Sequence, residues 1–274
     1  MTNVNSPRAL RAGILGYGSV GRGLGELIRA GVAGSVEVVG VLVREPSRYA
    51  DEATRTGWTF VDSAEALLAL RPTVVAEAAG HAGLRQHVPT LLRGGVEVLC
   101  ISVGALGDPE LLDSLLEAAA EGQSRLRVVS GAIAGLDAIS AAATIGLDEV
   151  THTIRKPPTS LLSVEEAAQV KASGEPRVLY RGPAREAARL FPENVNVAAA
   201  VSLAGIGLDR TIAQVVADPS VTRNTHEVSA KGAFGQLDIR MQNIPSENPK
   251  TGRIVAPSLA RVLRSYSEPL VVGA

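Results

Sequence analysis

Near the start of the sequence, three glycines have the spacing of a dinucleotide-binding turn, in the stretch Gly-Tyr-Gly-Ser-Val-Gly. In such a turn the first glycine permits a tight bend, the second lets the backbone approach a pyrophosphate, and the third lets the next helix pack closely. The start of that helix adds N–H groups and the positive end of its dipole. Because an apolar strand precedes the motif and a helical stretch follows it, we expect the whole segment to bind a dinucleotide. The segment comprises Gly16, Tyr17, Gly18, Ser19, Val20 and Gly21.

The residue that follows the second predicted strand bears on which dinucleotide is bound. An acidic side chain there binds the ribose 2′-hydroxyl of NAD, whereas an arginine accommodates the 2′-phosphate of NADP. The strand expected over residues 36–43 is followed by Arg44, with Arg48 shortly after it, and Glu45 is near enough to serve NAD. An exposed arginine without a ligand is the plainer alternative. NAD and NADP therefore both stay open as the cofactor.

The sequence has four histidines, and each has an ordinary structural explanation. His81 follows Gly80 at the end of a predicted strand, where both residues could contact the cofactor, although a histidine at a helix start is equally common. His87 falls within a predicted helix, and we expect it at the surface. His152 falls within a predicted strand, as a packing or surface residue. His226 opens a strand after a polar loop, and its imidazole, which titrates near neutrality, makes it a candidate general base.

Two further stretches lie at the boundaries of predicted elements. The small-residue stretch 130–135 marks the point where the strand–helix alternation ends, and Asn194 and Asn196 come just before a helix. One asparagine caps a helix well, but one cap does not require two asparagines, so a ligand-facing amide stays open. The sequence contains no Gly-x-Ser-x-Gly elbow, no metal-ligand cluster and no phosphate loop of the Gly-x-x-x-x-Gly-Lys type.

Composition restricts the class of protein. Among 274 residues, 27 Lys and Arg balance 28 Asp and Glu, which gives no basic field for nucleic acid or anionic lipid. The single cysteine, Cys100, cannot form an intrachain disulfide or a cysteine-based zinc site. The polar stretch 1–11 lacks the apolar core of a secretory signal, and the apolar run 195–208 is too short to span a membrane. We expect a cytoplasmic protein that binds neither nucleic acid nor membrane and holds no metal.

The elements that position these residues differ between the two halves. The first half alternates apolar strands with helices, including a helix that a capping box at Asp62 and Glu65 should start and another that begins at Asp108-Pro109. This alternation predicts an α/β fold with a Rossmann-type, doubly wound parallel sheet. After residue 131, three strand-like runs follow closely at 211–217, 226–231 and 234–242. They predict a second α+β domain with a mixed or antiparallel sheet.

These patterns predict a dinucleotide-binding domain over residues 1–131 and a second domain over residues 132–251. A last helical segment, within 252–274, carries apolar residues at helical spacing and should pack back on the first domain. Pro257 either starts this helix or kinks it.

The sequence resembles the L-aspartate dehydrogenase family over nearly its whole length. Besides the glycine turn, the matching stretches are Ser130–Asp137, Lys156–Pro158, Phe191–Ala198, Ala217–Pro219, Asn224–His226 and Asn243–Thr251. The resemblance implies a homodimer in which a Rossmann domain binds NAD(P) and the second domain, over residues 132–251, closes over it and serves catalysis and dimerisation. It also implies that His226 is the active-site histidine and that Ala132 and Asn196 contact the cofactor. Arg44 departs from the acidic residue of a strict NAD site.

The family's reaction is the reversible oxidative deamination of L-aspartate to iminosuccinate, then to oxaloacetate and ammonia, feeding NAD biosynthesis. A substrate with two carboxylates needs a fixed cation, and Lys156, which ends a strand before two prolines, is the candidate; a solvated lysine is the alternative. His226 fits a general base for the amine or for the attacking water. The competing hypotheses are an oxidoreductase resembling homoserine dehydrogenase or dihydrodipicolinate reductase, and a dinucleotide sensor without catalytic activity.

Overall fold

The computed structural model describes residues 9–191, 196–246 and 251–273. The chain divides into two compact units, each of which is described by itself. The first unit comprises Met1–Ser102, Pro109–Val129 and Val255–Ala274, and the second comprises Val103–Asp108 and Ser130–Ile254. No helix in the described part of the chain is long and apolar enough to cross a membrane.

The first unit is built on a six-stranded sheet with the strand order β3-β2-β1-β4-β5-β6, in which all neighbours run parallel. Its strands are β1 (Leu10–Leu15), β2 (Val36–Leu42), β3 (Phe60–Val61), β4 (Val74–Glu77), β5 (Glu97–Cys100) and β6 (Leu126–Val128). The strand order reverses between β1 and β4. Ligands of open α/β sheets bind at the carboxyl ends of the strands at such a switch point. The predicted doubly wound sheet is confirmed.

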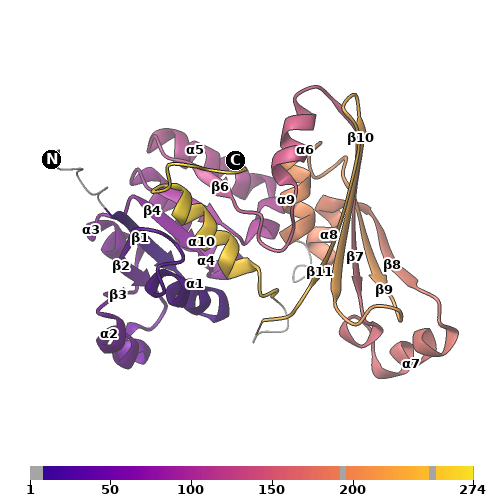
Figure 1. Cartoon of the computed structure of the whole chain (residues 1–274), viewed down its shortest axis with the longest axis horizontal. Helices are drawn as coiled ribbons and strands as arrows, with labels where there is room; N and C mark the ends of the chain where they lie inside the picture. Colours follow the sequence, from indigo (N-terminus) through magenta and orange to yellow (C-terminus); the bar gives the residue numbers. More distant parts are fainter. Residues whose placement is uncertain (1–8, 192–195, 247–250, 274) are drawn as a thin grey trace. The chain divides into compact units, whose positions relative to one another are not determined.

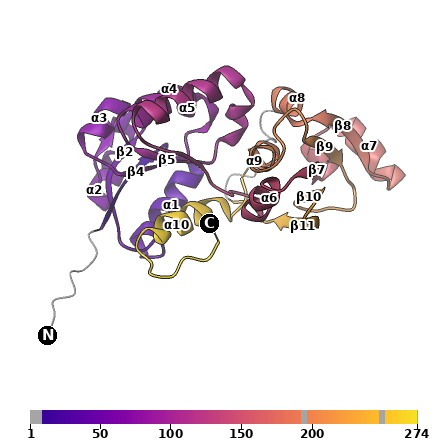
Figure 2. The ribbon, with the colours of Figure 1, turned by 90° about the horizontal axis from the view of Figure 1, so that it is seen from above.

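Helices cover both faces of this sheet. Figure 2 shows α3, α4 and α5 on one side and α1 and α10 on the other. The helical segments of this unit are α1 (Ser19–Arg29), η1 (Pro46–Tyr49), α2 (Ala50–Thr56), α3 (Ala64–Ala69), α4 (Gly80–Arg93), α5 (Pro109–Glu121) and α10 (Val255–Ser265). Helix α10 buries Leu259 and Leu263 in the core that α1 shares. Pro257 lies in the first turn of α10, which begins at Val255, and its missing N–H costs nothing there, so it does not kink the helix.

One helix cap differs from the prediction. Helix α3 begins after Ser63, whose hydroxyl accepts a hydrogen bond from the backbone N–H of Ala66. The predicted capping box of Asp62 and Glu65 was therefore wrong by one residue. Serine and aspartate are both good caps and stand side by side here, so spacing alone does not separate them.

The second unit contains a mixed five-stranded sheet with the order β11-β10-β7-β9-β8. Its strands are β7 (Leu147–Lys156), β8 (Arg177–Pro183), β9 (Ile212–Ala217), β10 (Asn224–Gly232) and β11 (Gly235–Asn243). The pair β7–β9 is parallel and the other pairs are antiparallel. Its helical segments are η2 (Val103–Gly107), α6 (Leu136–Ala143), η3 (Pro158–Ser160), α7 (Val164–Ser173), α8 (Ala184–Leu190) and α9 (Asn196–Ala204).

The two faces of the second sheet have different environments. In Figure 1, α6 and α9 lie together on one side of the sheet, and their apolar residues form a core with Val150 of β7 and Val228 of β10. Side chains alternate along a strand, so His152 shares the covered face with Val150, and His226 shares it with Val228. The opposite face carries polar residues such as Thr151 and Glu227. The strand alternation thus directs both histidines into the covered side.

Candidate active site

The glycine turn of the first unit has the backbone that the motif requires. Gly16 has φ +89°, and a Cβ built on it would lie 2.6 Å from Cα of Ala79. A Cβ on Gly21 would overlap the carbonyl oxygen of Gly16, so helix α1 packs as closely as the motif predicts. A Cβ on Gly18 would meet nothing within 4 Å, so this position faces open space. Gly18 is the N-cap of α1 and supplies no side-chain hydrogen bond, which leaves that helix start suited to a phosphate.

A cavity of about 490 Å³ lies beside this turn, at the carboxyl ends of β1, β2 and β4. Its lining includes Gly16, Tyr17, Gly18, Arg44, Ala79 and Gln86. The remaining predicted turn residues, Ser19, Val20 and Gly21, belong to α1 rather than to the lining. Gly80 and His81 open α4 next to Ala79, Gly80 with φ +78°, and neither is among the lining residues. The cavity has the position that a bound dinucleotide requires.

The tyrosine of the glycine turn has a structural role for its side chain. Tyr17 is buried, and its ring makes edge contacts with the rings of Tyr49, Trp58 and Phe60. The Arg22 guanidinium lies 5.7 Å from the centroid of the Tyr17 ring. The Tyr17 side chain therefore anchors α1 to the region after β2, and its backbone remains at the cavity.

The charges around the cavity at the end of β2 are unequal. Arg44 is exposed and lines the cavity, whereas none of the described lining residues is acidic. Glu45, the residue that could serve NAD, forms an ion pair with Arg48 at 2.7 Å. His87 also lines this cavity, and its side chain is buried, with 8% of its surface exposed. The prediction of a surface position for His87 was wrong: it lies on the face of α4 that packs inward, and burial lowers its pKa.

Sequence reasoning missed Glu77, the last residue of β4. Its carboxylate is fully buried and accepts hydrogen bonds from the N–H groups of Ala79 and Gly80, at 2.9 and 3.2 Å. It also accepts from the N–H groups of Ile101 and Ser102, at 3.3 and 3.0 Å, and from the Ser102 hydroxyl at 2.7 Å. Burial raises the pKa of Glu77, and these hydrogen bonds oppose the rise. The carboxylate holds the chain after β4 against the chain after β5, beside the switch point between β1 and β4. The sequence signal that could have identified Glu77 is that it is the one charged residue in the otherwise apolar strand β4.

In the second unit, the structure brings His226 together with a second histidine. His152 of β7 lies opposite Val228 of β10, so it is a diagonal neighbour of His226 on the covered face. Nε2 of His152 lies 3.1 Å from Nδ1 of His226, and the ring planes are 20° apart. His152 is 1% exposed and His226 6% exposed. Nδ1 of His226 is therefore engaged, and Nε2 is the nitrogen left for another partner.

Lys156 ends β7 on the same face as His152. Burial and then the positive charge of Lys156 lower the pKa of His226 to about 4. The pKa of His152 is lowered well below its ordinary value by burial and by His226. The adjacent Arg155 faces the other side of the sheet, where it pairs with Asp218 at 3.1 Å and Glu227 at 2.8 Å. The covered face thus combines neutral imidazoles with a lysine.

The two remaining predicted cofactor residues also lie in the second unit. Oδ1 of Asn196 accepts a hydrogen bond from the N–H of Gly104 at 2.8 Å, which ties the start of α9 to η2. The carbonyl oxygen of Ala132 accepts from Nδ2 of Asn243 at 2.9 Å. Asn194 lies outside the described residues. Within the described residues, no group of three or more His, Cys, Asp or Glu side chains is placed to hold a metal ion.

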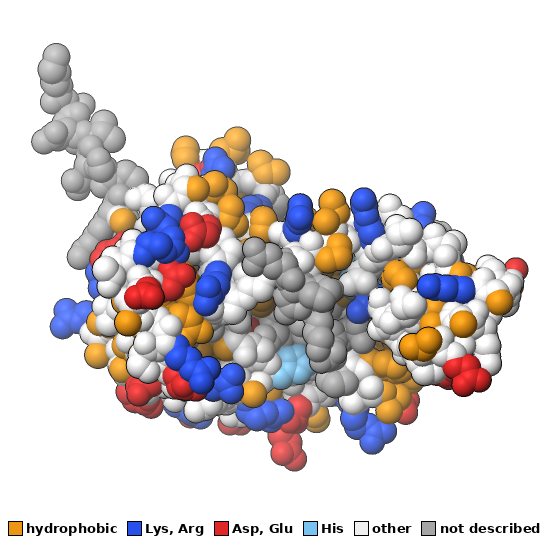
Figure 3. Space-filling view, turned by 90° about the horizontal axis from the view of Figure 1, so that it is seen from below, with side chains coloured by type: hydrophobic (Ala, Val, Ile, Leu, Met, Phe, Trp, Pro, Cys, Tyr) orange, Lys and Arg blue, Asp and Glu red, His pale blue; other side chains and the backbone are white. Residues whose placement is uncertain are grey.

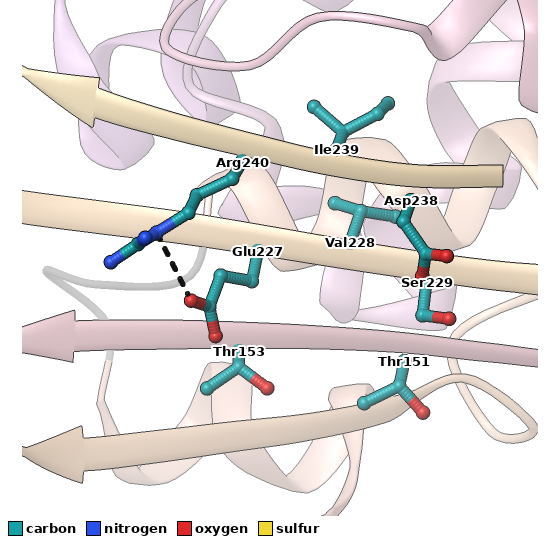
Figure 4. Close-up of a pocket in the computed structure, with 8 residues that line it drawn as sticks. All are labelled: Thr151, Thr153, Glu227, Val228, Ser229, Asp238, Ile239 and Arg240. Carbon is teal, nitrogen blue, oxygen red and sulfur yellow. Dashed lines mark ion pairs between the residues drawn. The ribbon is translucent and has the colours of Figure 1, made fainter.

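The opposite face of the second sheet has a hollow of about 350 Å³ of its own, with polar side chains from β7, β10 and β11. Figure 4 shows Glu227 of β10 reaching Arg240 of β11, an ion pair of 3.4 Å, while Asp238 and Ser229 lie further along. Figure 3 shows charges of both signs interspersed over the face of the molecule in view. The hollow is separate from the histidine pair because strand alternation puts them on opposite faces.

Comparison with known proteins gives two family matches, which together cover most of the chain. A family model described as the NAD-binding domain of homoserine dehydrogenase matches residues 16–129, and the aspartate dehydrogenase C-terminal model matches residues 137–266. L-aspartate dehydrogenase from Cupriavidus necator is 39% identical over 93% of this chain and 96% of that protein. L-aspartate dehydrogenase 1 from Bordetella pertussis is 42% identical, over 94% and 96% respectively. The crystal structure of Thermotoga maritima aspartate dehydrogenase has a TM-score of 0.76 and 24% identity, covering 97% of this chain and all of that one.

The dinucleotide-binding turn, its cavity and these matches define the chain as a dehydrogenase that uses a nicotinamide dinucleotide. Within that class, the matches to the second unit are specific. The chain belongs to the L-aspartate dehydrogenase family.

Proposed function

We propose that this protein catalyses the reversible oxidative deamination of L-aspartate to iminosuccinate, which water converts to oxaloacetate and ammonia. The observation that carries the proposal is a buried histidine, His226 of β10, close enough to Lys156 of the neighbouring strand β7 for the lysine charge to help lower its pKa. Both residues lie in the segment that matches the aspartate dehydrogenase C-terminal family. The family membership supports aspartate as the substrate and a supporting role in NAD biosynthesis.

The nicotinamide cofactor supplies the acceptor for the hydride that leaves the α-carbon. The residues present fit such a group: the bend at Gly16 and the close packing at Gly21 leave no room for a side chain, and Gly18 faces open space. The uncapped start of α1 suits the pyrophosphate. Ala132 and Asn196 are the proposed contacts from the second unit, and Gly80 and His81 those at the start of α4.

Arg44 supports the use of NADP(H) as well as NAD(H). Its guanidinium is the charged group next to the cavity at the end of β2, and the nearby Glu45 is already paired with Arg48. An arginine can bind a 2′-phosphate through two parallel hydrogen bonds. We propose that NADPH binds at least as tightly as NADH.

Lys156 and His226 have different roles toward the substrate. The ammonium of Lys156 binds a carboxylate of aspartate, which a protein site must neutralise. His226 is neutral near pH 7, since its pKa is lowered to about 4, and its Nε2 contacts the reacting centre. A neutral imidazole can either accept a proton there or donate a hydrogen bond, depending on its tautomer.

The test measures the absorbance of NADH or NADPH during incubation of the protein with oxaloacetate, in the presence and in the absence of ammonium. A fall in absorbance reports oxidation of the cofactor. Oxidation that requires ammonium is the expected result. Oxidation without ammonium indicates reduction of the keto acid and contradicts the proposal. Cofactor binding without any oxidation favours a sensor, and activity only on other substrates in a panel favours an enzyme like homoserine dehydrogenase.

We propose in addition that the protein is a cytoplasmic homodimer. Cys100 is a buried free thiol, which is in keeping with a reducing compartment. The open face of the second sheet carries Glu227 and Asp238 beside Arg240, and a surface with both signs can complement itself across a twofold axis. Light scattering after size exclusion should give the mass of two chains, and Arg240→Glu should shift it toward one. A monomer for the unaltered chain contradicts this proposal.

A further inference from the structure

The histidine pair has four ring nitrogens, and only two of them are hydrogen-bonded to each other. Each neutral imidazole carries one N–H and one lone pair. Nε2 of His152 and Nδ1 of His226 share one hydrogen bond, in which either nitrogen can be the donor. Nδ1 of His152 is buried and has no hydrogen-bond partner among the described residues. The nitrogen that donates between the rings therefore decides what His152 leaves unpaired and what His226 presents to a ligand.

The two arrangements differ in their cost. If His226 donates, the proton of His152 must sit on its Nδ1, where it becomes a buried N–H without an acceptor. If His152 donates from Nε2, its Nδ1 keeps only a lone pair. Buried N–H groups without a partner are rarer in proteins than acceptors that lack one. The geometry thus favours donation from His152.

We propose that His152 is a positioning residue: it donates its Nε2–H to Nδ1 of His226 and so fixes His226 as a neutral imidazole with the proton on Nε2. This inference rests on the proposed function and refines it. His226 then serves as a hydrogen-bond donor to an oxygen of the substrate and does not serve as a general base. The lowered pKa values of both histidines are in keeping with a neutral pair, and Lys156 is the positive charge that acts on His226.

The chemistry of such a donor is defined. When ammonia attacks oxaloacetate, its nitrogen forms the C–N bond and the carbonyl π electrons move onto the oxygen. An N–H already aimed at that oxygen stabilises the developing negative charge, and no proton leaves His226. A neutral histidine with a lowered pKa plays this electrophilic role in triosephosphate isomerase.

The first experiment reads the tautomers directly and needs no turnover. The native protein is labelled with ¹⁵N at histidine alone, which gives signals from four side chains. Long-range ¹H–¹⁵N correlation at pH 7 then distinguishes protonated from bare ring nitrogens, with His152→Leu and His226→Gln as assignment variants. We expect His226 to be protonated at Nε2 and bare at Nδ1. The reverse pattern, or a histidinium signal from either residue at pH 7, overturns the proposal.

The second experiment uses a substitution that keeps the donor but cannot act as a base. Glutamine places an amide N–H close to the position of the imidazole Nε2–H, whereas leucine places a methyl group there. We expect His226→Gln to keep kcat within about tenfold of the native enzyme and His226→Leu to lose about 10²–10³-fold. Equal losses of about 10²–10⁴-fold in both variants, each folded by circular dichroism, indicate a base and overturn the proposal.

A third variant tests the positioning role of His152. In His152→Leu, the tautomer of His226 is no longer fixed, so we expect a mixture of its two neutral forms and a lower kcat with little change in KM. An unchanged Nε2–H tautomer in this variant overturns the role of His152. If the native protein shows the expected tautomer but lacks activity with aspartate or oxaloacetate, the proposed function fails and the assignment of the pair stands.

Discussion

Glu77 and Ser102 join the carboxyl ends of two neighbouring strands: Oε1 of Glu77 accepts from the Ser102 hydroxyl, and Oε2 accepts from the Ser102 backbone N–H. The same carboxylate binds the N–H groups of Ala79 and Gly80, which begin the turn into α4. A single buried side chain therefore joins the loops that follow β4 and β5, and the loop after β4 borders the point where the strand order of the first sheet reverses. The cavity beside the glycine turn, where we propose that the cofactor binds, depends on this arrangement because Ala79 is part of its lining.

The first prediction follows from this carboxylate. Glu77→Leu removes the acceptor from buried backbone N–H groups, so we expect a loss of about 3–5 kcal/mol in the free energy of unfolding. Glu77→Gln keeps one acceptor oxygen and should lose less. Urea unfolding measures both, with Glu37→Gln in the exposed Arg11–Glu37 pair as the control, where we expect a change below about 1 kcal/mol. A stable Glu77→Leu protein with normal cofactor affinity would contradict the role of Glu77.

The second prediction concerns the choice between cofactors. Arg44→Ala should weaken NADPH binding by about 10–100-fold, because a charge-assisted contact to the 2′-phosphate is worth about 1.5–3 kcal/mol. NADH binding should change little. Arg48→Ala is the matched control, since Arg48 is engaged by Glu45 and is not among the residues that line the cavity. Fluorescence titration with each cofactor gives the Kd values. Equal losses for NADH and NADPH would mean that Arg44 does not read the 2′-position.

The third prediction separates binding from folding within the glycine turn. Gly18→Ala adds a methyl group into open space where the pyrophosphate approaches, so we expect at least about a tenfold loss of cofactor affinity with stability changed by about 1 kcal/mol or less. Gly21→Ala instead places its Cβ against the carbonyl oxygen of Gly16 and should destabilise the fold. Calorimetry and thermal unfolding of both variants test this contrast. A Gly18→Ala protein with native cofactor affinity would place the pyrophosphate elsewhere.

The fourth prediction concerns substrate charge. Lys156→Met should raise KM for oxaloacetate by about 30-fold or more, through loss of about 2–5 kcal/mol of carboxylate binding, and leave cofactor Kd unchanged. It should also raise the pKa of His226, because the lysine charge lowers it. Lys171→Met is the control, because Lys171 is exposed on α7, and its KM for oxaloacetate should equal that of the native enzyme. Steady-state kinetics and histidine titration by NMR provide the two measurements. A native KM in Lys156→Met would assign the carboxylate to another cation.

The fifth prediction concerns stability against pH. The pKa of His226 is about 4 in the folded protein and about 6.5 in an unfolded chain, so the unfolded chain binds more protons between these values. Stability should therefore be full above about pH 7 and fall as the pH drops from about 6.5 toward about 4, by up to roughly 1.4 kcal/mol per pH unit for each such histidine. His152 and His87 act in the same direction. Urea unfolding across this range should show a shallower slope in His226→Gln, and a flat profile in the native protein would contradict the buried neutral pair.

The first sheet was predictable because its longer strands are mainly apolar runs that alternate with helical segments. The second unit was less so. Helix α7 and strand β8 were missed: β8 is an edge strand whose residues are mostly half-buried or exposed, so it lacks an apolar pattern. The capping box of α7, with Ser163 and Glu166, was a usable signal that was overlooked.

In the candidate site too, local features could be predicted from the sequence, whereas contacts between distant residues could not. The glycine turn is local, and its backbone geometry could be predicted from the spacing of the glycines. The partners of Glu77 are backbone N–H groups, which every sequence has, including those of Ile101 and Ser102 from the next strand of the sheet. The contact between His152 and His226 joins residues 74 positions apart, and it depends on the register of β7 against β10. A one-residue change in that register would turn one ring to the opposite face.

The return of α10 to the first unit affects the order in which the molecule is made. The apolar face of α1 is covered in part by Leu259 and Leu263, which leave the ribosome only after the entire second unit. During synthesis the second unit can fold while the first still lacks α10. Folding of the first unit is therefore completed only after the second unit has been synthesised. A nascent chain stalled just before Val255 should expose the groove that α10 fills, and it should be a substrate for chaperones until the last helix arrives.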